Sequence, residues 1–311
     1  MNMTEHEEEA GARAILASRF DENDVQLVRQ EGGLSNCVFE AATSGGSLVL
    51  RMGPIENRSQ AFKRECRAIK HAGAAGVPVP EVVGQGELGP WAYICARKIE
   101  GESAANHPKR LEIVRRLARL ASGRIHSIPT AGFGHDFTFG HQATNDDGWR
   151  QWIEEEFKAA DRLTLLNRHG IIDDEQHAGF TGTIATIASW RGSPVLNHGD
   201  LRLKNVLVDQ DARIVALIDW ESCLSAIGPH WDLSIALHDL SVDQKEAFLD
   251  GYGLTAEEVR TFAPAWRLFN ALNYAPELER ILQSGDDTAL DHLRMRFSGL
   301  LDLYGEPECP R

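Results

Sequence analysis

The chain has 311 residues, of which 42% are hydrophobic and 25% are charged, and its formal net charge is −14. This composition is typical of a water-soluble globular protein, and the length allows either two lobes or one large domain. The negative balance argues against a nucleic-acid partner, because binding to phosphates needs a basic face. The sequence contains no run of 18 apolar residues, so it predicts no membrane span.

The N-terminal segment is acidic and lacks the apolar centre of a secretory signal. The cysteines are scattered and show no spacing typical of a zinc site: Cys37, Cys66, Cys95, Cys223 and Cys309. We therefore expect reduced thiols in a cytoplasmic protein.

The first third of the chain reads as short strands with two helices. Helical spacing of apolar residues predicts helices over residues 5–20 and 59–76. Strand-like runs, separated by glycine-containing turns, occupy the rest: residues 25–30, 37–43, 47–52, 77–87 and 91–99. This pattern predicts a small β-rich lobe.

Residues 100–103 break the strand pattern, and the sequence after them is mostly helical. Two long amphipathic helices are expected over residues 109–127 and 147–170. Residues 194–221 form a β-hairpin region with a turn near residues 209–212, and helices resume from there to the end. The sequence thus predicts an α+β fold with two lobes, divided into residues 1–99 and residues 100–311.

A polar cluster stands out in the hairpin region. The segment "HGDLRLKN" places Asp200 and Asn205 five residues apart, and Asp219 follows the apolar run "VALI" fourteen residues later. Asp and Asn are common in turns, so each residue alone would indicate only a turn. The joint spacing of the three groups after a β-rich lobe is far less common.

These segments resemble the aminoglycoside phosphotransferases and related small-molecule kinases, which share the protein-kinase fold. The resemblance covers most of the chain, because "GGLSN", "LVLR", "RECRAI", "VPVPEVV", "ICARKIEG", "GFG" and "GDLRLKN…IDW" follow that family's order. The order of several segments is most similar to the hygromycin B phosphotransferases. The resemblance implies a bilobal, protein-kinase-like fold with a nucleotide-binding N-lobe and a larger helical C-lobe.

The resemblance also implies roles for the polar cluster. Phosphoryl transfer needs a positioned hydroxyl, a group that accepts its proton, and divalent metal that neutralises charge. Asp200 resembles the catalytic Asp, and Asn205 and Asp219 resemble the Mg²⁺ ligands. Their hard oxygen atoms, completed by phosphate oxygens and water, suit Mg²⁺.

Three further residues receive weaker assignments, and two more are left without a role. Arg202 lies where protein kinases place a Lys near the γ-phosphate, so it either stabilises the transferring group or is an exposed loop residue. His198 is expected to shape the catalytic loop, and Asp232, in "IGPHWDLS", is expected to brace it. The roles of Lys204 and Glu221 stay open.

The N-lobe is expected to bind ATP or GTP. The segment "EGGLSN" lies between two strands, where backbone N–H groups can approach phosphate oxygens. Arg51 stands where these kinases usually carry a phosphate-binding Lys, and Glu65 is its candidate ion-pair partner. The run "ARKIEG" resembles the hinge that binds adenine through its backbone. The predicted nucleotide-binding residues are Gly33, Ser35, Asn36, Arg51, Glu65, Arg97 and Ile99.

The acceptor is expected to bind the helical lobe near Asp200. In aminoglycoside kinases, acids on such helices bind the ammonium groups of the drug, so the resemblance favours a cationic aminocyclitol. Glu-rich helix faces are otherwise usually only solvated. The candidate acceptor residues are Glu154, Glu155, Asn273, Tyr274 and Glu277.

Three functions remain open at this point. The first is an Mg²⁺-dependent antibiotic kinase that acts on a hygromycin-like aminoglycoside and confers resistance. The second is a kinase of the same fold that acts on a macrolide, choline, a sugar or an amino-acid-like metabolite. The third is a nucleotide-binding pseudokinase, which would have no need of Asp200, Asn205 and Asp219 together. We expect a monomer or a homodimer with no nucleic-acid or membrane partner.

Overall fold

The computed structural model describes four stretches of the chain: residues 4–20, 25–30, 37–141 and 147–301. The chain folds as two compact units. The first unit combines two segments that are distant in sequence, Met1–His107 and Lys204–Cys223. The second unit contains the remainder, Pro108–Leu203 and Leu224–Arg311. The division predicted at residues 99 and 100 stays a prediction.

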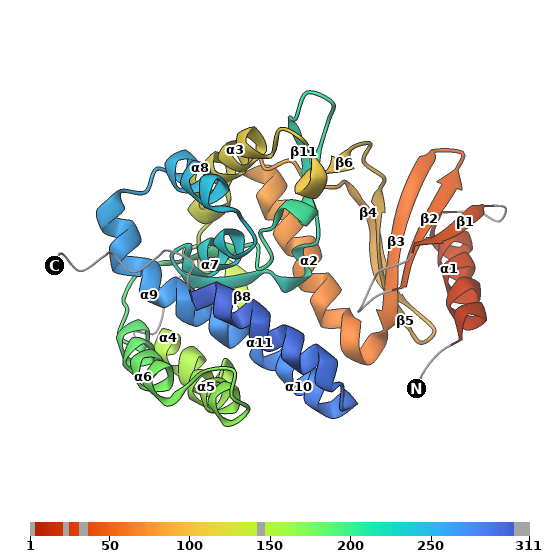
Figure 1. The fold of residues 1–311 in the computed structure, drawn as a ribbon. Helices are drawn as coiled ribbons and strands as arrows, with labels where there is room; N and C mark the ends of the chain where they lie inside the picture. The colour runs from red at the N-terminus through yellow and green to blue at the C-terminus, as the bar shows by residue number, and fades with distance from the viewer. Residues whose placement is uncertain (1–3, 21–24, 31–36, 142–146, 302–311) are drawn as a thin grey trace. The chain divides into compact units, whose positions relative to one another are not determined.

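An antiparallel five-stranded sheet forms the centre of the first unit, with the strand order β1-β2-β3-β5-β4 (Figure 1). Its strands are β1 (Gln26–Gln30), β2 (Cys37–Thr43), β3 (Gly46–Pro54), β4 (Val82–Leu88) and β5 (Trp91–Arg97). The central strand β3 carries Arg51, which lies opposite Val38 of β2 and Ile94 of β5. This central position holds the backbone of Arg51 by strands on both sides.

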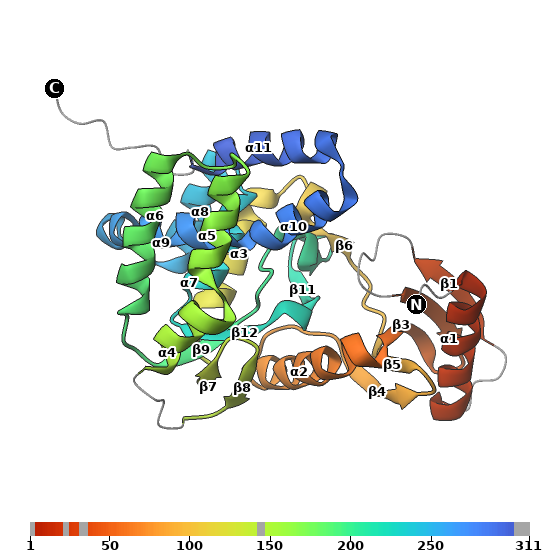
Figure 2. The same ribbon diagram turned by 90° about the horizontal axis from the view of Figure 1, so that it is seen from below.

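Helices α1 (Glu5–Phe20) and α2 (Ile55–Ala74) cover opposite faces of this sheet (Figures 1 and 2). Ile15 and Leu16 of α1 are fully buried in one cluster with Phe39 and Leu50 of the sheet. On the other face, α2 packs on β3, β4 and β5. Burial of apolar side chains on both faces stabilises the sheet, at about 25 cal/mol per Å² of apolar surface.

A later segment of the chain completes the first unit. Strands β10 (Val206–Val208) and β11 (Ile214–Leu217) form a hairpin, and β6 (Glu102–Ser103) pairs with β10. The N–H of Leu217 donates to the carbonyl of Pro78 at 2.8 Å, which ties the hairpin to the N-terminal part of the chain. The hairpin thereby brings Asn205 and Asp219 into the unit that contains Arg51.

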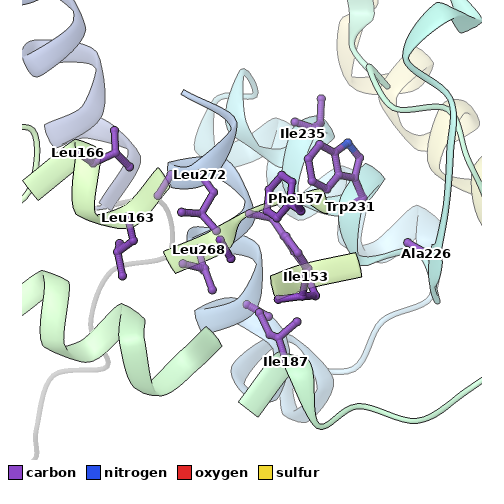
Figure 3. Packing of buried hydrophobic residues seen from close by; sticks show 14 of the residues in the cluster. Ile153, Phe157, Leu163, Leu166, Ile187, Ala226, Trp231, Ile235, Leu268 and Leu272 are labelled. Carbon is purple, nitrogen blue, oxygen red and sulfur yellow. The ribbon is translucent and has the colours of Figure 1, made fainter. Parts of the chain in front are cut away.

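The second unit is mainly helical. Its helices are α3 (Arg110–Gly123), α4 (Gly148–Gln151), α5 (Ala159–Arg168), α6 (Asp174–Ala188), α7 (His230–His238), α8 (Val242–Tyr252), α9 (Ala256–Asn273), α10 (Ala275–Ser284) and α11 (Asp287–Leu301). Two strand pairs accompany them: β7 (Thr130–Phe133) with β8 (Asp136–Phe139), and β9 (Pro194–Asn197) with β12 (Leu224–Ile227). Figure 3 shows the core, in which Phe157 and Trp231 lie beside each other among aliphatic side chains of several helices.

The single long helix predicted over residues 147–170 is wrong. The chain passes from α4 into a π-helical turn, η3 (Trp152–Glu156), and Lys158 then adopts a left-handed conformation with φ 53° before α5 begins. A π turn bonds residue i to residue i+5, as the N–H of Phe157 does with the carbonyl of Trp152 at 2.8 Å. The rings of Trp152 and Phe157 therefore lie on the same face of the turn and stack, with their centroids 5.1 Å apart. Aromatic packing overrides the helical pattern here.

Smaller departures follow from local chemistry. Helix α2 begins at Ile55 rather than at residue 59, and Pro54, which favours a helix start, precedes it. The strand expected from residue 77 begins only at Val82, after two prolines that cannot donate to a sheet ladder. Among the described residues, no helix combines the length and apolar character needed to cross a bilayer.

Candidate active site

The β10–β11 hairpin holds Asn205 and Asp219 at one end. Val206 pairs with Leu217, and the N–H of Ile218 donates to the carbonyl of Asn205 at 2.9 Å. Asn205 ends a short 3-10 turn and is buried, whereas the Asp219 side chain is 36% exposed. Asp219 adopts φ 65°, ψ 58°, a left-handed conformation that Asp tolerates better than most residues. The amide and the carboxylate are therefore carried by adjoining ends of two paired strands.

Arg51 lies among three carboxylates of the same unit. Its Nη1 donates to Oε1 of Glu65 on α2 at 2.6 Å, and its Nη2 donates to Oε2 of Glu221 at 2.7 Å. Nη2 also lies 3.4 Å from Oδ1 of Asp219. A planar guanidinium can serve two acceptors at once in fixed directions, which an ammonium group cannot do as rigidly.

The ionisation of this cluster follows from burial and opposite charge. Burial by itself would lower the pKa of Arg51, but Glu65, Asp219 and Glu221 outweigh it, so the pKa of Arg51 is raised. Burial raises the pKa of Glu65, whose side chain is only 2% exposed, and Arg51 opposes that shift. Oε2 of Glu65 is buried with no hydrogen-bond partner among the described residues. The short bond from Arg51 is therefore the main compensation for burying the Glu65 carboxylate.

Glu221, whose role the sequence leaves open, is held from several sides. It lies in the 3-10 turn Trp220–Ser222, directly after the buried Trp220, whose Nε1 donates to the carbonyl of Leu217 at 2.9 Å. Nη2 of Arg64 donates to the Glu221 carbonyl at 2.9 Å, and Nη1 of Arg58 lies 3.8 Å from Oε2. Since these contacts come from residues far apart in sequence, spacing alone could not reveal them.

The first unit supplies part of the set of ligands that a hard divalent cation needs. Asn205 and Asp219 offer an amide oxygen and a carboxylate oxygen, which are donors that Mg²⁺ accepts. Within the described part of the chain, no group of three or more His, Cys, Asp or Glu side chains is placed to hold a metal ion. Mg²⁺ typically keeps several water ligands and is bound by one or two protein groups plus substrate phosphates, which agrees with this donor set.

In the second unit, Asp232 organises the loop that contains Asp200. Asp232 lies in the first turn of α7 and is fully buried. Its Oδ2 accepts the N–H of His198 at 2.7 Å, and its Oδ1 accepts the N–H of Gly199 at 2.8 Å. Nε2 of His126 lies 3.0 Å from the same Oδ2. Two backbone groups and an imidazole are thus fixed by one carboxylate.

His198 continues this arrangement toward Asp200. The side chain of His198 is buried, and its Nδ1 accepts the N–H of Asp200 at 3.2 Å. Gly199 between them has φ 88°, a left-handed conformation that glycine adopts without strain. The loop therefore presents Asp200 from a backbone that is held on both sides.

The side chain of Asp200 forms an ion pair with Arg202. Nε of Arg202 lies 2.9 Å from Oδ1 of Asp200, and Nη1 lies 3.4 Å from Oδ2 of Asp239. Asp239 follows directly after α7 and was not singled out from the sequence. Lys204, the other cation of the segment, is exposed, and its carbonyl accepts the hydroxyl of Ser103 at 3.2 Å in the first unit.

The predicted acceptor residues lie in different surroundings. Glu154 and Glu155 are exposed on the π-helical turn η3, and Glu277 is exposed and paired with Arg280. The hydroxyl of Tyr274 bonds with Nε2 of His238, and Asn273 is half-buried. None of these five residues is among those that line the groove described next.

A groove with a volume of 520 Å³ lies beside the predicted acidic helix. It is lined by η3, α5 and the start of α10, through Glu156, Phe157, Lys158, Asp161, Arg162, Thr164, Leu165, Arg168, Ala275, Pro276 and Glu279. The guanidinium of Arg162 lies over the Phe157 ring, 4.3 Å from its centroid. Asp161 and Glu279 were not predicted from the sequence, because they belong to separate helices and only packing brings them to one groove.

Two chains of contacts link this groove to the Asp200 loop within the second unit. Phe157 packs edge-on against Trp231, with centroids 5.4 Å apart, and Nε1 of Trp231 donates to the carbonyl of Gly199 at 3.3 Å. Tyr274, directly before the groove residue Ala275, bonds with His238, the neighbour of Asp239. The groove is therefore connected to both the backbone and the side chains around Asp200.

The nucleotide-loop residues Gly33, Ser35 and Asn36 lie outside the described residues. In the predicted hinge, the N–H of Arg97 donates to the carbonyl of Glu81 at 2.9 Å. Ile99 lies just beyond the end of β5. The adenine contacts therefore stay a prediction.

Comparison with known proteins assigns the family. The family model described as phosphotransferase enzyme family matches residues 26–269. An aminoglycoside 3'-phosphotransferase of Streptomyces ribosidificus is 26% identical in an alignment of 242 residues that covers 72% of this chain and 86% of the relative. Hygromycin-B 4-O-kinase of Escherichia coli is 26% identical in an alignment of 220 residues that covers 68% of this chain and 61% of the relative.

The fold agrees with this assignment. The crystal structure of the aminoglycoside phosphotransferase APH(4)-Ia superposes with a TM-score of 0.70 and 20% identity, covering 96% of this chain and 100% of that chain. A thermostable mutant of the same enzyme was solved as a ternary complex with ADP and hygromycin B, at a TM-score of 0.66, 19% identity, and coverage of 95% of this chain and 99% of that chain. The predicted kinase-like α+β fold and the resemblance stated from the motifs are confirmed, and this chain is a kinase that belongs to the phosphotransferase enzyme family.

Proposed function

We propose that this protein transfers the γ-phosphoryl group of ATP to a hydroxyl group of a cationic aminoglycoside, with Mg²⁺ bound to the nucleotide. The observation that supports it most directly is the cluster around Arg51 in a chain of the phosphotransferase family. The Arg51 guanidinium lies 3.4 Å from the half-buried carboxylate of Asp219, so a group that can bind phosphate stands beside a group that can bind a cation. Phosphoryl transfer depends mainly on such positioning and charge neutralisation.

The proposed roles of the first unit concern the nucleotide. Arg51, oriented by Glu65, binds phosphate oxygens, and Asn205 and Asp219 hold Mg²⁺. Bound Mg·ATP supplies the phosphoryl group and the positive charge that stabilises its transfer. The loop residues Gly33, Ser35 and Asn36 and the hinge residues Arg97 and Ile99 are proposed to contact the nucleotide through their backbone.

The proposed roles of the second unit concern the acceptor hydroxyl. Asp200 accepts the hydroxyl proton, and Arg202, 2.9 Å from its Oδ1, forms an ion pair that orients this carboxylate. His198 and Asp232 act through the loop backbone and are positioning residues. Fixing the position of Asp200 can raise the rate of transfer, because interactions that strengthen in the transition state accelerate the reaction. Interactions that bind substrate and transition state equally do not.

The groove of the second unit supports a cationic acceptor. Its acids Glu156, Asp161 and Glu279 can bind ammonium groups, although the same lining also carries the cations Lys158, Arg162 and Arg168. Glu154, Glu155, Asn273, Tyr274 and Glu277 stay proposed contacts at its margins. The chain is 26% identical to a hygromycin kinase and to an aminoglycoside 3'-phosphotransferase. This similarity favours the same class of acceptor.

An ADP-release assay with purified protein tests this proposal. Acceptors should include hygromycin B and other aminoglycosides, together with a macrolide, choline, simple sugars and amino alcohols, each with ATP or GTP. We expect turnover with at least one aminoglycoside, its loss when Mg²⁺ is chelated, and its recovery when Mg²⁺ is restored. The Asp219→Asn variant should lose both transfer and the enhancement of nucleotide binding by Mg²⁺.

Two outcomes would contradict the proposal at different levels. Turnover with a neutral acceptor and none with any aminoglycoside would remove the acceptor class and leave the kinase. Nucleotide binding without any turnover across a broad acceptor panel would favour a pseudokinase. Expression in an aminoglycoside-sensitive bacterium adds a separate readout, because a drug-modifying kinase should raise the inhibitory concentration of its own acceptor alone.

A further inference from the structure

Arg51 shares its guanidinium unequally between carboxylates. Nη1 bonds only with Glu65 among the contacts described above, at 2.6 Å. Nη2 has two carboxylates within reach, Glu221 at 2.7 Å and Asp219 at 3.4 Å. Since charge-assisted N–H···O⁻ bonds are strongest near 2.7–2.9 Å, Glu221 holds this nitrogen more firmly than Asp219 does.

The position of Glu221 is fixed independently of Arg51. The buried Trp220 anchors the turn before it, and Arg64 of α2 bonds with the Glu221 carbonyl. Arg58 adds a second cation 3.8 Å from Oε2. Glu221 is therefore a well-placed acceptor beside α2, while Asp219 lies two residues earlier and is more exposed to solvent.

We propose that Glu221 is a positioning residue that holds Arg51 against Glu65 and away from Asp219, so that the Asp219 carboxylate stays available to the divalent cation that accompanies the nucleotide. This inference rests on the proposed function, in which Asp219 binds Mg²⁺. Without Glu221, the nearest carboxylate for Nη2 is Asp219, only 3.4 Å away. Arg51 would then neutralise Asp219 and compete with Mg²⁺.

The geometry also gives a reason for arginine at position 51. Glu65 and Glu221 are reached by two different nitrogens of one planar group. Lysine has a single nitrogen and would have to choose between them. Arg51 and Glu221 thus form a matched pair, and Arg51→Lys should resemble the loss of Glu221 rather than behave as a neutral exchange.

The test is a titration of nucleotide binding against Mg²⁺, without acceptor and without turnover. ADP binding is measured by calorimetry at increasing Mg²⁺ for the wild type and for Glu221→Gln. We expect the Mg²⁺ concentration that gives half of the enhancement to rise about tenfold in the variant, the effect of losing one charge-assisted hydrogen bond. ADP binding without Mg²⁺ should change much less. Glu56→Gln, an exposed change in the first turn of α2, removes the same charge from the same unit and should match the wild type.

A second pair of variants separates positioning from a direct effect of charge. In an Arg51→Met background, Glu221→Gln should leave the Mg²⁺ midpoint unchanged, because the group that competes for Asp219 is gone. Persistence of the tenfold shift in this background would overturn the proposal and make Glu221 a direct partner of the cation. Such double-mutant cycles isolate the coupling between two residues.

The remaining outcomes are also decisive. An unchanged midpoint in Glu221→Gln, while the wild type shows clear Mg²⁺ enhancement, would refute the inference alone. Absence of any Mg²⁺ enhancement in the wild type would instead refute the proposed metal role of Asp219. Thermal unfolding checks each variant, and if Glu221→Gln does not fold, Glu221→Asp, which is one methylene shorter, carries the same prediction.

Discussion

The polar clusters of the two units are built in different ways. In the first unit, side chains of opposite charge hold one another, with Arg51 bonded to Glu65 and Glu221 and near Asp219. In the second unit, the fully buried Asp232 holds backbone N–H groups of the loop that carries Asp200. A charged ligand can replace an ion-pair partner in the first cluster. The second cluster resists such an exchange, because both carboxylate oxygens of Asp232 already accept hydrogen bonds from backbone N–H groups.

The difference agrees with the roles that we propose for the two units. Binding a nucleotide with its cation requires charges that can be redistributed when phosphate and metal arrive. Directing a hydroxyl toward the transferred group requires one carboxylate in a fixed place, and small displacements cost large factors in rate. The predictions that follow probe this contrast, beginning with the largest expected effect.

Asp200→Asn should reduce turnover by about 10²- to 10⁴-fold, the usual contribution of a positioned acid–base group. The loop backbone stays bonded to Asp232, so the fold and ADP binding should be close to wild type. Steady-state turnover and ADP calorimetry measure the two effects. A variant with near-wild-type turnover would show that Asp200 does not take the hydroxyl proton.

Asp232→Ala should destabilise the protein by about 3–5 kcal/mol, because it breaks a buried charged network and leaves the N–H groups of His198 and Gly199 without their acceptor. Urea unfolding followed by tryptophan fluorescence measures this. The control is Asp250→Ala, which removes an exposed acid paired with Arg115 and should cost less than about 1 kcal/mol. Equal costs for the two variants would refute the bracing role of Asp232.

Acid should weaken the fold through two half-buried histidines of the second unit, His230 and His238. Burial lowers the pKa of His230 and of His238 to about 4. Because the folded values lie below the unfolded one, the unfolded chain takes up protons first as the pH falls. The free energy of unfolding should therefore drop between about pH 6.5 and pH 4, by up to about 1.4 kcal/mol per pH unit for each imidazole.

The pH dependence can be assigned with single variants. His230→Gln should flatten the slope of unfolding free energy against pH in that window. The exposed His292 provides the control, and His292→Gln should keep the wild-type slope. A slope that is the same in all three proteins would place the acid sensitivity elsewhere.

The smallest effects are expected at the acids of the second unit, which are exposed and separately weak. Exposed ion pairs contribute about 0.2–1 kcal/mol each, so the double variant Asp161→Asn/Glu279→Gln should raise the acceptor KM about 2- to 30-fold and spare that of ATP. The acceptor KM should also rise with salt, since such pairs are screened over about 8–10 Å. The matched double variant Glu154→Gln/Glu155→Gln removes acids that do not line the groove. A larger effect from this second pair would move the acceptor out of the groove and onto the face first predicted.

The sequence predicted most of the architecture because the relevant signals are local. Helix α1 matches the predicted range of residues 5–20, and β2 matches residues 37–43, since periodic burial is written into neighbouring residues. The kinase-like fold and the family followed from the order and spacing of motifs along the chain. The prediction of one helix over residues 147–170 was wrong, because stacking of Phe157 on Trp152 and its packing against Trp231 favour a π turn over a continuous helix.

By itself, then, the sequence predicted the kinase-like fold and the family, and it singled out the segment that holds Asp200, Asn205 and Asp219. Only the tertiary structure decided that Glu221 is a partner of Arg51, that Asp239 meets Arg202, and that Asp161 and Glu279 line one groove. These residues are separated by 170, 37 and 118 positions. No periodic pattern in the sequence reveals the partner of a carboxylate across such separations, because the packing of strands and helices decides which groups meet.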